Sequence, residues 1–136
     1  MKQVQWFPGH MFKSLREIKE KIKLMDMVFI LLDARLPYSS VNPNLLDIVG
    51  KKPTLLLFNK MDLTEPSKLN FWMQYYQRKG FYTLAIDAQK GKNIAKIYDV
   101  SKDILKAKFE RLANKGLKEQ PIRAMILGIP NVESWL

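Results

Sequence analysis

Cysteine is absent from this 136-residue sequence, and histidine occurs only once, at His10. Without cysteine, the chain can form neither a disulfide framework nor a thiolate metal site. A single histidine also excludes a metal site built from several histidines. We therefore expect no metal-binding residues of either kind.

Long apolar segments are absent as well. No apolar run approaches the roughly 18 residues that a membrane-spanning helix requires. Residues 1–10 also lack the apolar core of a secretory signal peptide. These absences favour a cytoplasmic protein without a membrane partner.

Acidic residues are scarce relative to basic ones. The sequence has 23 Lys and Arg against 13 Asp and Glu, which gives a formal net charge of +10. Such an excess indicates a polyanionic partner, and the wide spread of the lysines favours nucleic acid over a merely soluble basic protein. Apolar residues make up 47 % of the chain, as in a globular domain with a core.

Apolar runs and amphipathic segments alternate along the chain. Strands are predicted at 27–32, 54–58, 82–86 and 122–127, and helices at 13–25, 44–49, 66–79 and, as one long helix, 94–112. This alternation predicts an α/β fold with about four parallel strands and flanking helices. Ligands of such sheets bind beyond the carboxyl ends of the strands, so the residues there are the candidates for function.

The second apolar run is followed at once by the tetrapeptide Asn59-Lys60-Met61-Asp62, which has the form N-K-x-D. A carboxylate at Asp62 can accept hydrogen bonds from both guanine N1–H and the exocyclic amine, and adenine offers no such donor pair. Asn59 would tie the loop together, and the stem of Lys60 would cover the base. In the alternative interpretation, Asp62 or Thr64 merely caps the next helix.

The ends of two later strands complete the predicted site. Asp87 and Ala88 follow the third strand, where a small residue would let a backbone N–H approach the guanine carbonyl oxygen. The fourth strand leads into the start of a phosphate-binding loop, G-x-x-x-x-G-K-[ST], at Gly128, Pro130, Asn131 and Val132. The glycine, lysine and hydroxyl residue that would bind phosphate and Mg²⁺ are replaced by Glu133, Ser134 and Trp135. This loop is therefore predicted to be vestigial.

Two further features are open to two interpretations each. His10, in an aromatic segment before the first helix, is either a catalytic group or a polar surface residue. The basic side chains of the first and last helices either contact RNA or form a solvated face: Lys13, Arg16, Lys19, Lys21, Lys23, Lys102, Lys106, Lys108, Arg111, Lys115 and Lys118.

Taken together, these motifs resemble the circularly permuted GTPases of the ribosome biogenesis GTPase A (YlqF/RbgA) type, in which N-K-x-D precedes the phosphate loop. The segments that carry the resemblance are 6–11, 33–43, 59–62 and 128–132, in the order of that family. The resemblance implies a P-loop NTPase-like sheet and a cytoplasmic GTPase that binds GTP or GDP with Mg²⁺. It also implies contact with the large ribosomal subunit and its rRNA, and a water-positioning role for His10.

The family pattern is interrupted after Val132, where G-K-S-T would be expected. We therefore expect an incomplete domain, with an N-terminal anchor segment and basic helix at 1–25 and a partial GTP-binding domain at 26–136. The expected function is guanine-nucleotide binding without hydrolysis, and the magnesium ligands of the family are missing. A frameshift, a premature stop and an artificial chain end all fit the interruption. The alternative functions are a basic RNA- or ribosome-binding module that ignores nucleotide, and a remnant without function.

Overall fold

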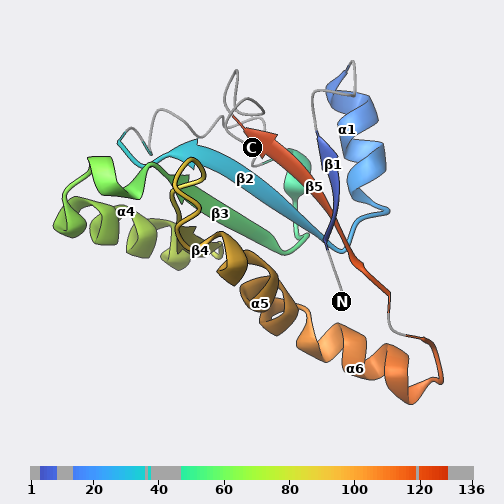
Figure 1. Cartoon of the computed structure of the whole chain (residues 1–136). Coiled ribbons are helices and arrows are strands. Elements are labelled where there is room, and N and C mark those ends of the chain that lie inside the picture. The colour runs from blue at the N-terminus through green and yellow to red at the C-terminus, as the bar shows by residue number, and fades with distance from the viewer. Residues whose placement is uncertain (1–3, 9–13, 36, 38–46, 119, 129–136) are drawn as a thin grey trace.

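The computed structural model describes residues 4–8, 14–35, 37, 47–118 and 120–128 of the chain. Its strands are β1 (Val4–Pro8), β2 (Met27–Asp33), β3 (Thr54–Asn59), β4 (Tyr82–Ala85) and β5 (Ile122–Gly128), and its α-helices are α1 (Leu15–Ile22), α4 (Pro66–Arg78), α5 (Ile94–Ile104) and α6 (Lys106–Asn114). The strands form one sheet in the order β1-β5-β2-β3-β4, and every pairing is parallel (Figure 1). The predicted α/β fold is confirmed.

The central strands β2 and β3 are buried along their whole length. A parallel strand buried on both faces requires a layer of helices above and below the sheet. Helices α1 and α4 cover one face, where Ile18 and Tyr76 pack into the core. Helices α5 and α6 cover the other face through residues that include Ile97 and Phe109. The apolar runs therefore account for both the strands and the layers that enclose them.

The sheet contains one strand more than the sequence predicted. The first strand, β1, pairs with β5 alone, with Val4 beside Ile122 and Pro8 beside Ile126. Proline is tolerated on an edge strand because the missing N–H removes no hydrogen bond from the interior of a sheet. Residues 4–8, which include part of the aromatic segment predicted as an anchor, thus form an edge strand of the sheet. The domain boundary predicted after residue 25 stays a prediction.

The predicted long helix 94–112 is wrong in one respect, because it is divided into α5 and α6 at Leu105. Leu105 has φ −96° and ψ 7°, outside helical values. One turn earlier, the Ser101 hydroxyl donates to the carbonyl oxygen of Ile97 over 2.7 Å. Such a bond back to the preceding turn bends a helix. The buried side chain of Leu105 marks this bend. Of the short helix predicted at 44–49, residues 47–49 are described and are helical.

Helix α6 is tied to the sheet by Asp26, which lies just before β2 and is 7 % exposed. Its Oδ1 accepts a 2.8 Å hydrogen bond from Lys108 Nζ, and its Oδ2 accepts a 2.8 Å bond from the backbone N–H of Arg123. One carboxylate therefore joins α6, β2 and β5. It compensates its own burial with two short, charge-assisted bonds.

Replacing Asp26 by alanine is expected to lower the free energy of unfolding by about 2–3 kcal/mol, because hydrogen bonds to a buried charge are lost. Urea denaturation would measure the change. Lys23→Ala is the matched control, since it removes the exposed ion pair with Glu20 and should cost no more than about 1 kcal/mol. Equal losses in the two variants would show that Asp26 does not anchor α6.

Candidate functional site

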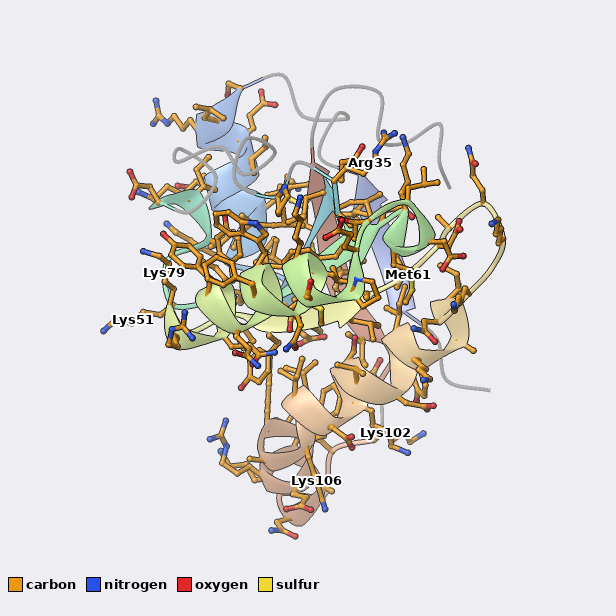
Figure 2. All side chains as sticks on the ribbon, turned by 90° about the vertical axis from the view of Figure 1, so that its left-hand side faces the viewer. Arg35, Lys51, Met61, Lys79, Lys102 and Lys106 are labelled. Atoms are coloured by element: carbon orange, nitrogen blue, oxygen red, sulfur yellow. The ribbon has the colours of Figure 1, made fainter. Side chains whose placement is uncertain are left out.

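The carboxyl ends of the central strands meet at one edge of the sheet. Asp33 ends β2 beside Asn59, which ends β3, and Phe58 pairs with Ala85 at the end of β4. The turn at 60–63 and the turn at 86–93 therefore leave the sheet side by side. Figure 2 shows this edge with Arg35 and Met61 labelled. The polar residues of this edge lie in these turns, directly before them, or at the end of β2 and just after it.

Asn59 joins the two turns. Its side chain is buried, with 1 % of the residue exposed, and its Oδ1 accepts a 2.9 Å hydrogen bond from the backbone N–H of Ala88. A second link is the 3.1 Å bond from the N–H of Met61 to the carbonyl oxygen of Ile86. Within the described part of the chain, Asn59 Nδ2 is buried and has no hydrogen-bond partner. The site thus contains one unsatisfied donor group.

The sequence predicted that a backbone N–H of the turn that contains Ala88 reaches the guanine carbonyl oxygen, and the N–H of Ala88 is one candidate. In the structure that N–H donates to Asn59 Oδ1. Both interactions could exist together only if the N–H were shared between two acceptors. The guanine-binding role of Ala88 therefore stays a prediction, whereas its bond with Asn59 is a structural link that the sequence did not predict.

Asp62 lies in a short 3-10 turn, η2 (Met61–Leu63), and its side chain is partly exposed. Its carboxylate pairs with Lys92 at 3.1 Å and with Lys90 at 3.6 Å, both from the turn after β4. The hydrogen bond from Lys92 is the main reason that the pKa of Asp62 lies below its ordinary value. Asp62 is therefore ionised at neutral pH and remains an acceptor.

Helix α4 begins after Glu65, and no side chain caps it. The alternative interpretation, in which Asp62 or Thr64 caps this helix, is thus wrong.

Asp87 has a local role in the turn that carries these lysines. Its Oδ1 accepts from the backbone N–H of Lys90 at 3.2 Å, and its backbone pairs with Lys92 in both directions. Asn93 closes the same turn with φ 63°, and its Nδ2 donates to the carbonyl oxygen of Ala85 over 2.9 Å. The sequence did not single out Asn93. Asparagine directly before a helix was the available signal, since asparagine tolerates the left-handed conformation.

Two charged residues next to Asn59, Asp33 and Arg35, were not among the predicted site residues, whereas their neighbour Lys60 was. Asp33 is 5 % exposed, and its carboxylate accepts bonds from Arg35 Nη2 at 2.6 Å and Nε at 3.0 Å. Lys60 Nζ lies 3.7 Å from the same carboxylate. Lys60 itself has φ 63°, a conformation that costs a non-glycine residue free energy. Asp33 thus fixes the residue that begins the turn.

Of the residues predicted for the site or for RNA contact, five lie outside the described part of the chain: His10, Lys13, Pro130, Asn131 and Val132. Gly128 is described and ends β5 beside Leu31 of β2, at the same edge of the sheet as Asn59. The described residues contain no group of three or more acidic, histidine or cysteine side chains that could hold a metal ion. None of the described helices is long and apolar enough to span a membrane.

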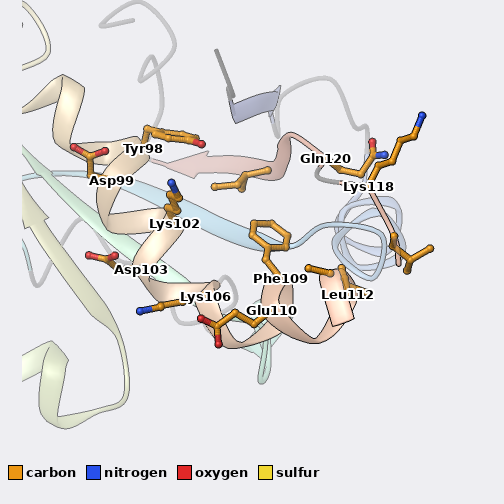
Figure 3. A pocket seen from close by; sticks show the side chains of 13 residues that line it. Tyr98, Asp99, Lys102, Asp103, Lys106, Phe109, Glu110, Leu112, Lys118 and Gln120 are labelled. Carbon is orange, nitrogen blue, oxygen red and sulfur yellow. The ribbon is translucent and has the colours of Figure 1, made fainter. Parts of the chain in front are cut away.

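A cavity among the described residues lies away from this edge. It has a volume of about 680 Å³ and lies between α5, α6 and the start of β5 (Figure 3). Its wall includes apolar Phe109 and Leu112, and its charged residues, among them Lys106 and Glu110, are of both signs. It lacks the strand-end amide and carboxylate groups of the edge described above.

Comparisons with known proteins define the fold class first. A solved GDP-bound structure of TM YlqF matches 85 % of this chain and 43 % of its own chain, with a TM-score of 0.51 and 21 % sequence identity. At this identity the likeness shows the fold alone. The parallel sheet with helices on both faces is therefore a fold that this chain shares with TM YlqF. No family model matches the chain.

Several proteins are more similar to this chain in sequence than that structure is. Ribosome biogenesis GTPase A of Priestia megaterium is 50 % identical over 95 % of this chain and 45 % of its own length. The Bacillus licheniformis protein of the same name is 47 % identical over 95 % of this chain and 46 % of its own length. The mouse mitochondrial ribosome-associated GTPase 1 is 34 % identical over 94 % of this chain and 39 % of its own length.

The chain is thus a homologue of ribosome biogenesis GTPase A over nearly all of its own length, and the resemblance inferred from its motifs is confirmed. It spans about half the length of the curated relatives that it matches.

The ion pairs of Asp33 predict how the stability of the fold depends on pH. Hydrogen bonds from Arg35, opposed by burial, hold the pKa of Asp33 below its ordinary value. The stabilisation is therefore present above the unfolded pKa of about 3.9 and is lost as pH falls through the lower folded value. Asp33→Asn should cost about 1–2 kcal/mol at pH 7, and this difference from wild type should shrink below about pH 4.

Urea denaturation at pH 7 and at pH 3 would measure the difference. Asp103→Asn, at an exposed position on α5, is the control and should change stability by no more than about 0.5 kcal/mol. A cost of Asp33→Asn that stays constant between the two pH values would show that the charge of Asp33 contributes nothing.

Proposed function

We propose that this chain recognises the guanine base of GTP or GDP at the carboxyl edge of its sheet, as part of a GTPase that acts in ribosome assembly. The observation that carries the proposal is the buried amide of Asn59, whose Oδ1 is committed to Ala88 while Nδ2 has no partner among the described residues. Relatives named ribosome biogenesis GTPase A support the assembly role.

The unsatisfied amide argues for a ligand at this edge. A buried donor without a partner costs about 1–3 kcal/mol. An acceptor on the edge of a bound base would remove that cost. Because Asn59 Oδ1 already receives the N–H of Ala88, the orientation of the amide is fixed and the free donor cannot be exchanged for the acceptor. The residues present therefore fit a purine base.

Asp62 supplies the selectivity for guanine in this proposal. An ionised carboxylate has roughly four acceptor positions, and the lysines of the neighbouring turn occupy only part of that capacity. Guanine N1–H and the exocyclic amine could then donate to Asp62 without complete loss of the ion pairs. Adenine would bring an acceptor towards a carboxylate, which is unfavourable. The stem of Lys60 would cover one face of the base.

The residues of this chain fit phosphate binding and hydrolysis less well than they fit base recognition. At 133–135 the chain has Glu, Ser and Trp in place of the glycine, lysine and hydroxyl residue that would hold phosphate and Mg²⁺. We propose that GTP or GDP is held mainly through its nucleoside and that hydrolysis is undetectable. Gly128, Pro130, Asn131 and Val132 would be a vestigial phosphate loop. The role of His10 in positioning an attacking water rests on the resemblance alone.

The exposed basic residues of the helices favour RNA as a second partner. Several cationic side chains of α1 are exposed, among them Arg16, Lys19 and Lys21, and they form a surface that suits rRNA of the large ribosomal subunit in the cytoplasm. The same surface favours the rival function, in which the chain is an RNA- or ribosome-binding module that does not bind nucleotide. The two functions differ in whether guanine nucleotides bind at all.

Calorimetric titration with guanosine, GDP, GTP and ADP should separate these functions. Guanosine, with about 20 non-hydrogen atoms at roughly 0.3 kcal/mol each, should bind with a Kd of tens of micromolar at best. GDP should bind no more than a few-fold differently, and ADP should not bind. Asp62→Ala should abolish binding, because the paired acceptors are lost.

Asp99→Ala is the matched control, since it removes one exposed acid of α5 and should leave the titration unchanged. Binding of ADP as tight as that of GDP would exclude a guanine-selective site. An absence of binding by all four ligands would favour the RNA-binding module.

A further inference from the structure

The end of the sheet opposite Asn59 contains a small basic cavity of about 260 Å³. It lies between the turn that precedes β3 and the turn that precedes β4, which are neighbours because Leu55 pairs with Tyr82. Three lysines line it, Lys51, Lys52 and Lys79, and its lining contains no acidic residue. A concave site with three cations and no carboxylate is suited to an anion.

The three lysines are placed in different ways. Lys52 Nζ donates to the carbonyl oxygen of Met25 at 2.9 Å, which leaves two of its three donors. Lys79 Nζ lies 5.0 Å from the ring centre of Tyr75, so a cation–π contact restrains it. Lys51 is exposed and has no ion-pair partner among the described residues. Two of the lysines are therefore held before any ligand arrives.

Neighbouring charges add to the positive potential of this cavity. The pKa of Lys52 is lowered by burial first and then by the positive charges of Lys108 and Arg123, with Asp26 acting against them. Asp26 is already committed to Lys108 and to the backbone of Arg123. An anion bound beside Lys52 would relieve this repulsion between like charges.

An exposed aromatic ring stands at the same cavity. Tyr82 lines it and is 47 % exposed, whereas the adjacent Phe81 is partly buried in the core. Lysines that hold a backbone next to a ring on which a base can stack are the combination used to bind single-stranded nucleic acid. A cavity of this size admits a phosphate and its sugar, so the base would lie outside it, against Tyr82.

We propose that this cavity binds the phosphodiester backbone of single-stranded RNA, with Lys51, Lys52 and Lys79 on the phosphate and Tyr82 beneath a base. The inference rests on the RNA partner in the proposed function and assigns that partner a defined site. Figure 2 shows Lys51 and Lys79 at one end of the sheet and Arg35 and Met61 at the other. The six residues of β3 separate the two ends by about 17–20 Å, so RNA and guanine nucleotide can bind together.

The test is fluorescence anisotropy of a labelled single-stranded 12-nucleotide RNA at 50–200 mM KCl. Lys51→Gln combined with Lys79→Gln should weaken binding at least about five-fold and reduce the salt slope by up to about 0.7, because the cavity holds one phosphate and each neutralised phosphate contributes about 0.7. Tyr82→Ala should weaken binding by about five-fold or more. The control, Lys68→Gln with Lys96→Gln, removes the same charge from exposed positions on α4 and α5 and should change binding less than two-fold.

Each outcome decides the proposal. Equal loss in the two double variants would show that charge acts diffusely and would overturn the site, although RNA would remain a partner. No RNA binding by the wild-type chain would overturn the site and the RNA partner together, while the guanosine titration remains an independent test. Displacement of RNA by millimolar inorganic phosphate would assign the cavity to free phosphate. Vesicles of phosphatidylserine test a membrane as the partner. If Lys51→Gln with Lys79→Gln abolished vesicle binding, while the control double variant kept it and RNA binding was unchanged, the cavity would be assigned to a membrane.

Discussion

Every side chain of β2 and β3 is buried, and this constraint determines where polar chemistry can occur in the molecule. A strand enclosed on both faces can carry polar groups only at its ends, because a buried polar group without partners is costly. Asp33 and Asn59 therefore lie where the strands finish, and the basic cavity lies where β3 and β4 begin. The two candidate surfaces are consequences of one apolar interior.

At the carboxyl edge, most of the polar groups form hydrogen bonds or ion pairs with one another. Asp33 fixes Lys60, Asn59 fixes Ala88, and Asp62 is paired with the turn after β4. These bonds connect three separate segments of the chain, so the turns are positioned before a ligand is present. Preorganisation of this kind lowers the entropy cost of binding. In the proposed function, the remaining donor of Asn59 is the group that a bound base would approach.

Much of this arrangement could be predicted from sequence, for reasons that are local. The apolar runs predict four of the five strands, β2 to β5, and the N-K-x-D tetrapeptide after β3 draws attention to Asn59 and Asp62. The edge strand β1 was missed because its pairing with β5 depends on residues more than 100 positions away. The break at Leu105 and the roles of Arg35 and Asn93 were missed for a similar reason. They depend on the bend of a helix and on contacts across turns, which no periodicity encodes.

The strand order has a consequence for the way the chain folds during its synthesis. The strand β5, the last of the described strands to leave the ribosome, inserts between β2 and the first strand, β1. Until it arrives, β2 and β3 can pair but one edge of β2 stays open, and β1 has no partner. Contacts of such long sequence separation slow folding and expose apolar edges meanwhile. These apolar edges of a nascent chain would thus stay exposed until β5 joins β1 to β2.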